Sequence, residues 1–433
     1  MKLISGRAWC WILYDFANTI FALNILSLYF ALWVTSDLPG GEYLYAPAFS
    51  LSMVAVALAS PVLGNLADRM GNKKFLVLFT LLCVGATAIL PLSWGALSAL
   101  ALFIVANFSY QIGLVFYNSL LPAVSTPENR GRVSGLGVSL GYAGAIFGMY
   151  LVYPFVEPGV YQKLPEWLRA VIGSLSVQDL TLKTGPLRIN AFLPSALLFL
   201  VFALPLFTGV REPLRDRVRP DRAPVLKEIW ATLRALPGQR DLALFLLANF
   251  LYEDVIHTVI LVMAIYAEKA IGFSSQGAIN LLIAISTVAA ILASYVWGWL
   301  CDRRPLKGVM LWVLGVWMGA LILALGITSQ REFYAVGVLA GVGLGGVWVV
   351  SRLCLLALAP RERIGEYFGL YGVTGKVAAV VGPLVWSGVL LLFSYREDLK
   401  YRAAIAALLV LLGAALAIFS RVRIPEARRC QTP

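Results

Sequence analysis

The sequence predicts an all-α polytopic membrane protein with twelve transmembrane helices in two pseudo-symmetric six-helix halves. Three observations carry this prediction: the composition, a series of long apolar runs and an internal repeat. Of 433 residues, 60% are hydrophobic and 13% are charged, and the mean hydropathy is +0.81. A soluble domain carries about 25% charged residues. The composition therefore excludes a soluble enzyme, a secreted disulfide scaffold and a disordered chain.

Twelve apolar runs follow one another along the chain, and each is long enough to cross a bilayer as a helix. They cover residues 9–34, 46–66, 74–92, 95–121, 132–155, 189–209, 241–267, 277–300, 306–327, 333–358, 365–394 and 401–420. The first run is far longer than the apolar part of a signal peptide and lacks a small-residue cleavage site. We therefore expect it to remain as the first helix.

The net charge of +12 follows the loops between these runs. If the N-terminus is cytoplasmic, 24 of the 35 Lys and Arg residues lie in inward segments and nine in outward segments. The remaining two, Arg352 and Lys376, lie within runs. This bias predicts a protein of the cytoplasmic membrane with both termini in the cytoplasm. The basic charge therefore indicates topology and contact with anionic lipids, and no nucleic-acid partner is expected.

Cofactor and enzyme signatures are missing from the sequence. The five cysteines have no paired spacing and none lies in an outward segment, so neither disulfides nor a metal site are expected. Residues 341–346 satisfy the pattern G-x-G-x-x-G, but they lie inside an apolar run without a preceding strand. No hydrolase-like constellation is present, so we expect no cofactor and no enzymatic activity.

The chain repeats itself at a constant offset of 234 residues. The identical pairs are Gly64/Gly298, Leu66/Leu300, Asp68/Asp302, Arg69/Arg303, Lys73/Lys307, Glu128/Glu362, Gly131/Gly365, Gly135/Gly369, Leu136/Leu370, Gly141/Gly375 and Gly148/Gly382. This repeat predicts two bundles of the same topology, over residues 1–209 and 241–433. Residues 210–240 form an Arg- and Pro-rich cytoplasmic linker with a surface helix near 225–236. The outward segment 156–188 is expected to hold a short interfacial helix.

Residues 64–74 read GNLADRMGNKK, which resembles the loop signature of the major facilitator superfamily. The resemblance implies that superfamily's twelve-helix fold. Asp68 is placed to meet the positive N-terminal end of the helix that begins near Gly365, and Asp302 is placed to meet the helix near Gly131. Such contacts require a closed cytoplasmic side, so they predict gating. The expected gating residues are Asp68, Arg69, Asp302, Arg303, Glu128 and Glu362. The alternative is that these loops are basic anchors with a tight turn.

Four further stretches carry a narrower resemblance. They are WILYDFANTIF at 11–21, NSLLPAV…ENRGRVSGLGVSLGYAG at 118–144, FLLANFLYEDVIHT at 245–258 and EYFGLYGVTGKVAAVVGPL at 366–384. They resemble the branch that contains the yeast autophagy-related vacuolar amino-acid effluxer and its bacterial relatives. The resemblance implies export of an amino acid or similar metabolite. Two departures affect the substrate: His257 and Trp348 stand where the family pattern has amides.

Ionisable groups within apolar runs are candidates for substrate binding or coupling because they are costly in a membrane. Asp15, Asn18, Glu253, Asp254 and His257 form this set. Asp15 and Asp254 begin a local repeat at an offset of 239. Burial favours a protonated carboxyl group, so these acids are candidate proton carriers. Asp15 has the alternative of a packing hydrogen bond, and His257 that of a neutral polar residue. Glu253 and Asp254 point about 100° apart on a helix, so only one is expected to face the cavity.

Two other helices carry candidate polar groups. Asn107, Gln111 and Asn118 share one face of the fourth helix and serve either substrate binding or interhelical hydrogen bonding. Lys376 lies near the middle of the eleventh run, where it suits an acidic partner or a substrate carboxylate. Tyr371 lies on another face of the same helix.

These features together predict a monomeric secondary transporter that moves a small organic solute by alternating access, coupled to protons. The expected cavity lies between the first, fourth, seventh and tenth helices. Two alternatives stay open. One is export of lipophilic, drug-like or lipid compounds, and the other is a non-transporting sensor or membrane scaffold.

Overall fold

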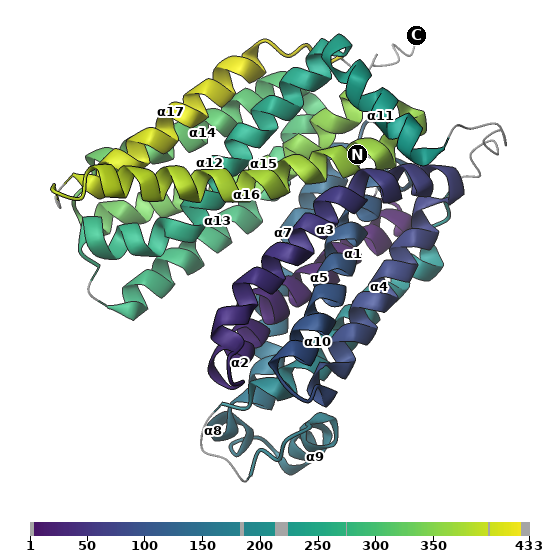
Figure 1. Cartoon of the computed structure of the whole chain (residues 1–433), viewed down its shortest axis with the longest axis vertical. Helices are drawn as coiled ribbons and strands as arrows, with labels where there is room; N and C mark the ends of the chain where they lie inside the picture. Colours follow the sequence, from purple (N-terminus) through teal and green to yellow (C-terminus); the bar gives the residue numbers. More distant parts are fainter. Residues whose placement is uncertain (1–3, 182–185, 213–223, 274, 397–398, 426–433) are drawn as a thin grey trace. The chain divides into compact units, whose positions relative to one another are not determined.

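The computed structural model describes residues 4–181, 186–212, 224–273, 275–396 and 399–425 (Figure 1). Within these ranges the regular secondary structure is helical, and twelve helices are long and apolar enough to cross a membrane. The predicted fold class is therefore confirmed. Part of the Arg-rich linker (213–223), Arg428, Arg429 and Cys430 lie outside the described residues.

Contacts divide the chain into two compact units. The first comprises residues 1–59, 69–124 and 140–217. Its helices are α1 (Gly6–Phe21), the π-helical η1 (Ala22–Tyr29), α2 (Phe30–Ser36), α4 (Asn72–Ile89), η2 (Leu90–Leu92), α5 (Ala96–Ser119), α6 (Leu121–Val124), α8 (Pro158–Tyr161), α9 (Glu166–Leu175), η3 (Arg188–Ala191) and α10 (Phe192–Gly209). Two long helices, α3 (Gly41–Met70) and α7 (Arg130–Val156), are shared between the units.

The second unit comprises residues 60–68, 125–139 and 218–433. Its helices are α11 (Val225–Ala235), η4 (Leu236–Gly238), α12 (Arg240–Ile271), α13 (Gln276–Arg303), α14 (Leu306–Gly326), α15 (Gln330–Leu358), η5 (Arg361–Arg363), α16 (Ile364–Leu392) and α17 (Lys400–Ser420). The predicted boundaries at 209 and 240 remain a prediction, since one end each of α3 and α7 groups with the second unit. The linker helix expected near 225–236 is present as α11.

Aromatic side chains fill the core of the first unit. Trp11 stacks on Tyr117 with ring centroids 4.2 Å apart, and Phe30 stacks on Phe103 at 4.3 Å. These four side chains are at least nine-tenths buried. Stacked rings on α1, α2 and α5 add specific geometry to apolar burial, so they fix how these helices pack.

Glycines allow α7 to approach neighbouring helices closely. A Cβ atom at Gly144 would overlap the carbonyl oxygen of Phe16 on α1. In the second unit, a Cβ atom at Gly131 would overlap the carbonyl oxygen of Gly298 on α13. Backbone atoms cannot yield as a flexible side chain can, so these positions require glycine.

The segment between α7 and α10 forms a small cap on the first unit. Phe155, Ile172, Leu180 and Leu187 pack together there, and α8 and α9 lie beyond the ends of the unit's long helices (Figure 1). A salt bridge of 2.7 Å joins Arg188 to Asp37. The short helix that the sequence predicts within 156–188 is present as α9.

Candidate functional site

Glu253 is the centre of a buried polar cluster in the second unit. It lies in the middle of α12, and only 2% of its surface is exposed. The Tyr371 hydroxyl on α16 donates to its Oε1 at 2.9 Å, and Asn249 hydrogen bonds to it from the preceding turn of α12. Lys376 on α16 is close enough to attract the carboxylate electrostatically. A buried carboxyl group thus lies within electrostatic range of a half-buried lysine on the neighbouring membrane helix.

Gly375 makes room for this carboxylate. A Cβ atom at Gly375 would overlap Oε2 of Glu253. The glycine next to Lys376 therefore lets the acid approach the backbone of α16, and a larger residue there would displace Glu253.

Asn249 extends the cluster to a third helix. Its Nδ2 donates to Thr374 Oγ1 at 3.0 Å, and its Oδ1 accepts from the Tyr252 hydroxyl. That hydroxyl is also 2.8 Å from Ser351 Oγ on α15. Polar contacts between α12, α15 and α16 orient the groups around Glu253, a role that the sequence pattern did not assign to Asn249, Tyr252 or Ser351.

The Asp254 carboxylate accepts a hydrogen bond from the backbone of α16. Its Oδ1 accepts from the Gly382 N–H at 2.5 Å, and only 1% of the residue is exposed. Glu253 and Asp254 therefore both pack against α16, and their separation of about 100° turns neither away from that helix. Contacts one helical turn or more apart on a neighbouring helix accommodate both side chains. That only one of them faces a cavity remains a prediction.

His257 and Trp348 lie together in the second unit. Their ring centroids are 5.7 Å apart, and His257 is half-buried. Lys376 acts electrostatically on His257 as well as on Glu253. The two residues that depart from the family's amide pattern are thus neighbours, and one of them is close to the Glu253 cluster.

The candidates of the first unit are buried but more dispersed. Asp15, Asn18 and Gln111 are each at least nine-tenths buried, and Asn118 is half-buried. Asn107 is fully buried and donates to Ser52 Oγ on α3 at 2.6 Å. For Asn107, this contact matches the hydrogen-bonding alternative.

The glycines of the repeat show which residues of α1 and α12 lie at matching places. Gly141 faces Thr19 and Asp15, while its repeat mate Gly375 faces Glu253. Gly148 faces Ile20, while its mate Gly382 faces Thr258 and Asp254. The equivalence of Asp15 with Asp254 at an offset of 239 remains a prediction, because these contacts fit more than one alignment of α1 with α12.

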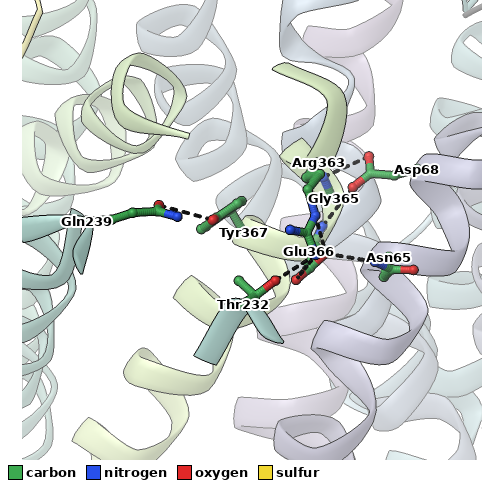
Figure 2. A network of polar contacts seen from close by, with 8 residues as sticks. All are labelled: Asn65, Asp68, Thr232, Gln239, Arg363, Gly365, Glu366 and Tyr367. Atoms are coloured by element: carbon green, nitrogen blue, oxygen red, sulfur yellow. Dashed lines mark hydrogen bonds and ion pairs between the residues drawn. The ribbon is translucent and has the colours of Figure 1, made fainter. Parts of the chain in front are cut away.

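The contact predicted for Asp68 is present. Its carboxylate accepts from the N–H groups of Gly365 and Glu366 at 2.9 and 3.0 Å, at the first turn of α16 (Figure 2). These N–H groups have no partner within the helix, and the helix dipole favours an anion there. A Cβ atom at Gly64, one turn earlier on α3, would overlap the carbonyl oxygen of Gly365. We call this contact the α3–α16 latch.

Three residues that the sequence pattern did not reveal complete this latch. Glu366 Oε2 accepts from Asn65 Nδ2 at 2.7 Å, and Arg363 forms an ion pair with Glu366 at 2.8 Å (Figure 2). Arg363 offsets the repulsion between the neighbouring acids Asp68 and Glu366. The repeat could have drawn attention to Glu366. Its mate in the first half is Arg132, so a charged residue occupies this position next to the helix N-terminus in both halves.

Asp302 forms the equivalent α7–α13 latch. Its carboxylate accepts from the N–H groups of Gly131 and Arg132 at 2.7 and 3.2 Å. Arg132 Nε also donates to it at 2.7 Å. Both predicted contacts are therefore present, and their role in gating remains a proposal.

The other predicted gating residues lie around the latches. Glu128 and Glu362 are exposed, and Arg69 is half-buried. The Arg303 guanidinium stacks over Trp299 at 4.1 Å from the ring centroid. Arg303 is thus placed by an aromatic ring on its own helix.

Comparison with known proteins finds relatives among membrane transporters. Residues 43–432 match the family model described as "Vacuole effluxer Atg22 like". An uncharacterized protein of Aquifex aeolicus is 29% identical over 93% of both chains. The uncharacterized MFS-type transporter YxiO of Bacillus subtilis is 26% identical over 89% of this chain and 88% of its own.

Solved structures share the fold. The major facilitator transporter FucP in its outward conformation matches 96% of this chain and 98% of its own, with a TM-score of 0.71 and 15% identity. The human organic anion transporter MFSD10 matches the same shares with a TM-score of 0.68 and 14% identity. With twelve membrane helices, a 234-residue repeat and a family model that covers most of its length, this chain belongs to the Atg22-like family of major facilitator transporters.

Proposed function

We propose that this transporter exports a small amino acid or similar zwitterionic metabolite in exchange for protons, and that the Glu253 cluster is its binding and coupling site. The observation that carries the proposal is the cluster between α12 and α16 in which the buried Glu253 and Asn249 lie close to the half-buried Tyr371 and Lys376. Export is taken from the effluxer description of the family.

A buried acid–base pair suits exchange between a proton and a substrate. Charges in the membrane interior are costly unless they are paired. When a proton neutralises Glu253, Lys376 loses its counter-ion and can receive a substrate carboxylate. When the proton leaves, Glu253 competes with that carboxylate for Lys376. Occupancy by proton and by substrate is thus linked through one lysine.

The two latches supply the conformational step of alternating access. Each joins a carboxylate to the first turn of a helix, and each contact breaks when those helices separate. We propose that both latches close the cytoplasmic side of a protein in the cytoplasmic membrane, with both termini in the cytoplasm. Because one chain contains both halves, we propose that a monomer suffices.

A binding screen tests the substrate. Thermal-shift measurements on the detergent-purified protein with amino acids, sugars, nucleosides and lipophilic cations should show stabilisation by amino acids, since a ligand of the folded state raises its melting temperature. The stabilisation should disappear in Lys376→Met. A response confined to lipophilic cations would favour export of lipophilic compounds.

Flux measurements in proteoliposomes test the coupling. Glu253→Gln should abolish transport driven by a pH gradient while it retains substrate exchange, because Gln cannot carry the proton. The double variant Glu268→Gln/Lys269→Met is the matched control, since it removes an exposed ion pair from the same helix. Full pH-driven transport in Glu253→Gln would contradict the proposed coupling.

A further inference from the structure

The helix α11 connects the linker to the α3–α16 latch. Thr232, which is 2% exposed, accepts from Arg363 Nη2 at 2.6 Å (Figure 2). Arg363 also holds Glu366 of the latch. Four residues after the end of α11, Gln239 Oε1 accepts from the Tyr367 hydroxyl at 3.2 Å. The linker is therefore tied at two points to the start of α16, once through α11 itself and once through the residue before α12.

The opposite face of α11 is basic, aromatic and exposed. Lys227, Trp230 and Arg234 follow the spacing i, i+3 and i+7, which places them on one side of a helix. Trp230 is 57% exposed, and the Arg234 guanidinium stacks over its ring at 5.1 Å. Ile229 and Thr232 point into the protein instead.

The position of α11 along the chain puts this face at a membrane surface. The span that begins at Arg240 follows α11 after four residues, and Arg363 lies at the start of the span Arg361–Leu392. Tryptophan prefers the interface between water and lipid, and basic side chains there attract anionic headgroups. The linker sequence 211–240 adds to the attraction, with eight basic residues against four acidic ones.

We propose that the Lys227–Trp230–Arg234 face of α11 binds anionic phospholipid headgroups of the cytoplasmic leaflet, and that this binding stabilises the α3–α16 latch through Thr232 and Arg363. A bound lipid holds α11 against the interface, so Thr232 remains in place to accept from Arg363. The proposal that α11 binds lipid does not depend on the proposed transport cycle. The proposal that bound lipid affects gating rests on the proposed function.

Native mass spectrometry of the full-length detergent-purified protein tests lipid binding. Titration with phosphatidylglycerol should show tighter binding than titration with phosphatidylcholine. Each charge contributes about fivefold to affinity for an anionic surface, so Lys227→Gln/Arg234→Gln should weaken phosphatidylglycerol binding by about 30-fold. The control Arg421→Gln/Arg423→Gln removes the same charge from exposed residues after α17 and should retain most of the affinity.

Two results would overturn lipid binding at this face. One is equal affinity for the two lipids, which would leave an acidic protein partner as the occupant. The other is an equal loss in the control variant, which would indicate unspecific attraction. An unchanged melting temperature without phosphatidylglycerol shows that the α11 variant is folded.

The coupling to the latch has its own readout. In nanodiscs, phosphatidylglycerol should slow maleimide labelling of Cys301, a half-buried residue beside Asp302 at the α7–α13 latch. Thr232→Val removes the acceptor for Arg363 and should abolish this lipid effect while phosphatidylglycerol still binds. If Thr232→Val keeps the full lipid effect, the coupling through Thr232 is wrong. This test needs no transport substrate, so it can fail independently of the proposed substrate.

Discussion

Asp68→Asn should open the α3–α16 latch. The carboxylate accepts two hydrogen bonds from backbone N–H groups at a helix N-terminus and is 4% exposed. Asparagine keeps one acceptor oxygen and loses the charge. The loss of one charge-assisted hydrogen bond and of the charge–dipole attraction amounts to about 2–3 kcal/mol. The ratio of open to closed protein should therefore rise by about 30- to 150-fold.

Gly64→Ala should have the same effect for a steric reason. Its Cβ atom would overlap the Gly365 carbonyl oxygen, so α3 and α16 cannot close fully. Gly85→Ala is the matched control, because a Cβ atom there meets nothing within 4 Å. Asp68→Asn removes an attraction between α3 and α16, and Gly64→Ala adds a repulsion between them. If both variants open the protein, the contact between these two helices is what holds it closed.

Maleimide labelling of Cys301 measures opening at a distance from the altered site. The other four cysteines are replaced, and the labelling rate follows the open fraction while the closed state dominates. Asp68→Asn should raise the rate by about 30- to 150-fold, since the α3–α16 contact contributes about 2–3 kcal/mol. Gly64→Ala should raise it as well, and Gly85→Ala should leave it unchanged. Gly131→Ala, at the reporter's own latch, shows that the reporter responds. If Gly131→Ala raises the rate while Asp68→Asn and Gly64→Ala leave it at the parent value, the reasoning is refuted.

Three other predictions concern the buried polar groups. Glu253→Gln or Lys376→Met alone should destabilise the protein by about 3–5 kcal/mol, because each leaves a buried partner uncompensated, and the double variant should recover most of that loss; a thermal-denaturation mutant cycle with additive losses would contradict their pairing. Tyr371→Phe should leave expression intact and weaken substrate-induced thermal stabilisation, since only its hydroxyl contacts Glu253; unchanged stabilisation would remove Tyr371 from the site. Asn107→Leu should lower stability by about 0.6 kcal/mol and retain transport, as expected of an interhelical hydrogen bond; loss of transport without loss of stability would instead favour a binding role.

The long apolar runs and the 234-residue repeat follow from the order of the residues alone. Membrane helices must satisfy their backbone groups internally, so hydropathy locates them. The contacts of Asp68 and Asp302 were also predictable from the sequence. The repeat places each carboxylate opposite the N-terminus of a helix, and helix N-termini attract negative charge. The contacts with Gly365 and Gly131 confirm this part of the prediction.

The side-chain partners inside the second unit required the tertiary structure. The sequence placed Lys376 and Glu253 in different helices, and their pairing depends on the packing of α12 against α16 with Gly375 between them. This contact was not accessible from spacing, because spacing within one helix says nothing of the register of its neighbour.

The sequence by itself thus determined the membrane class, the twelve helices, the internal repeat and the two latch carboxylates, since these depend on hydrophobicity and on local helix electrostatics. The tertiary structure decided that Glu253 and Asp254 both pack against α16, that Asn107 bonds to α3, and that α11 is tied to Arg363 at the start of α16. Those features depend on contacts between residues that are far apart in the chain, such as Thr232 with Arg363, and close packing at glycines sets their register.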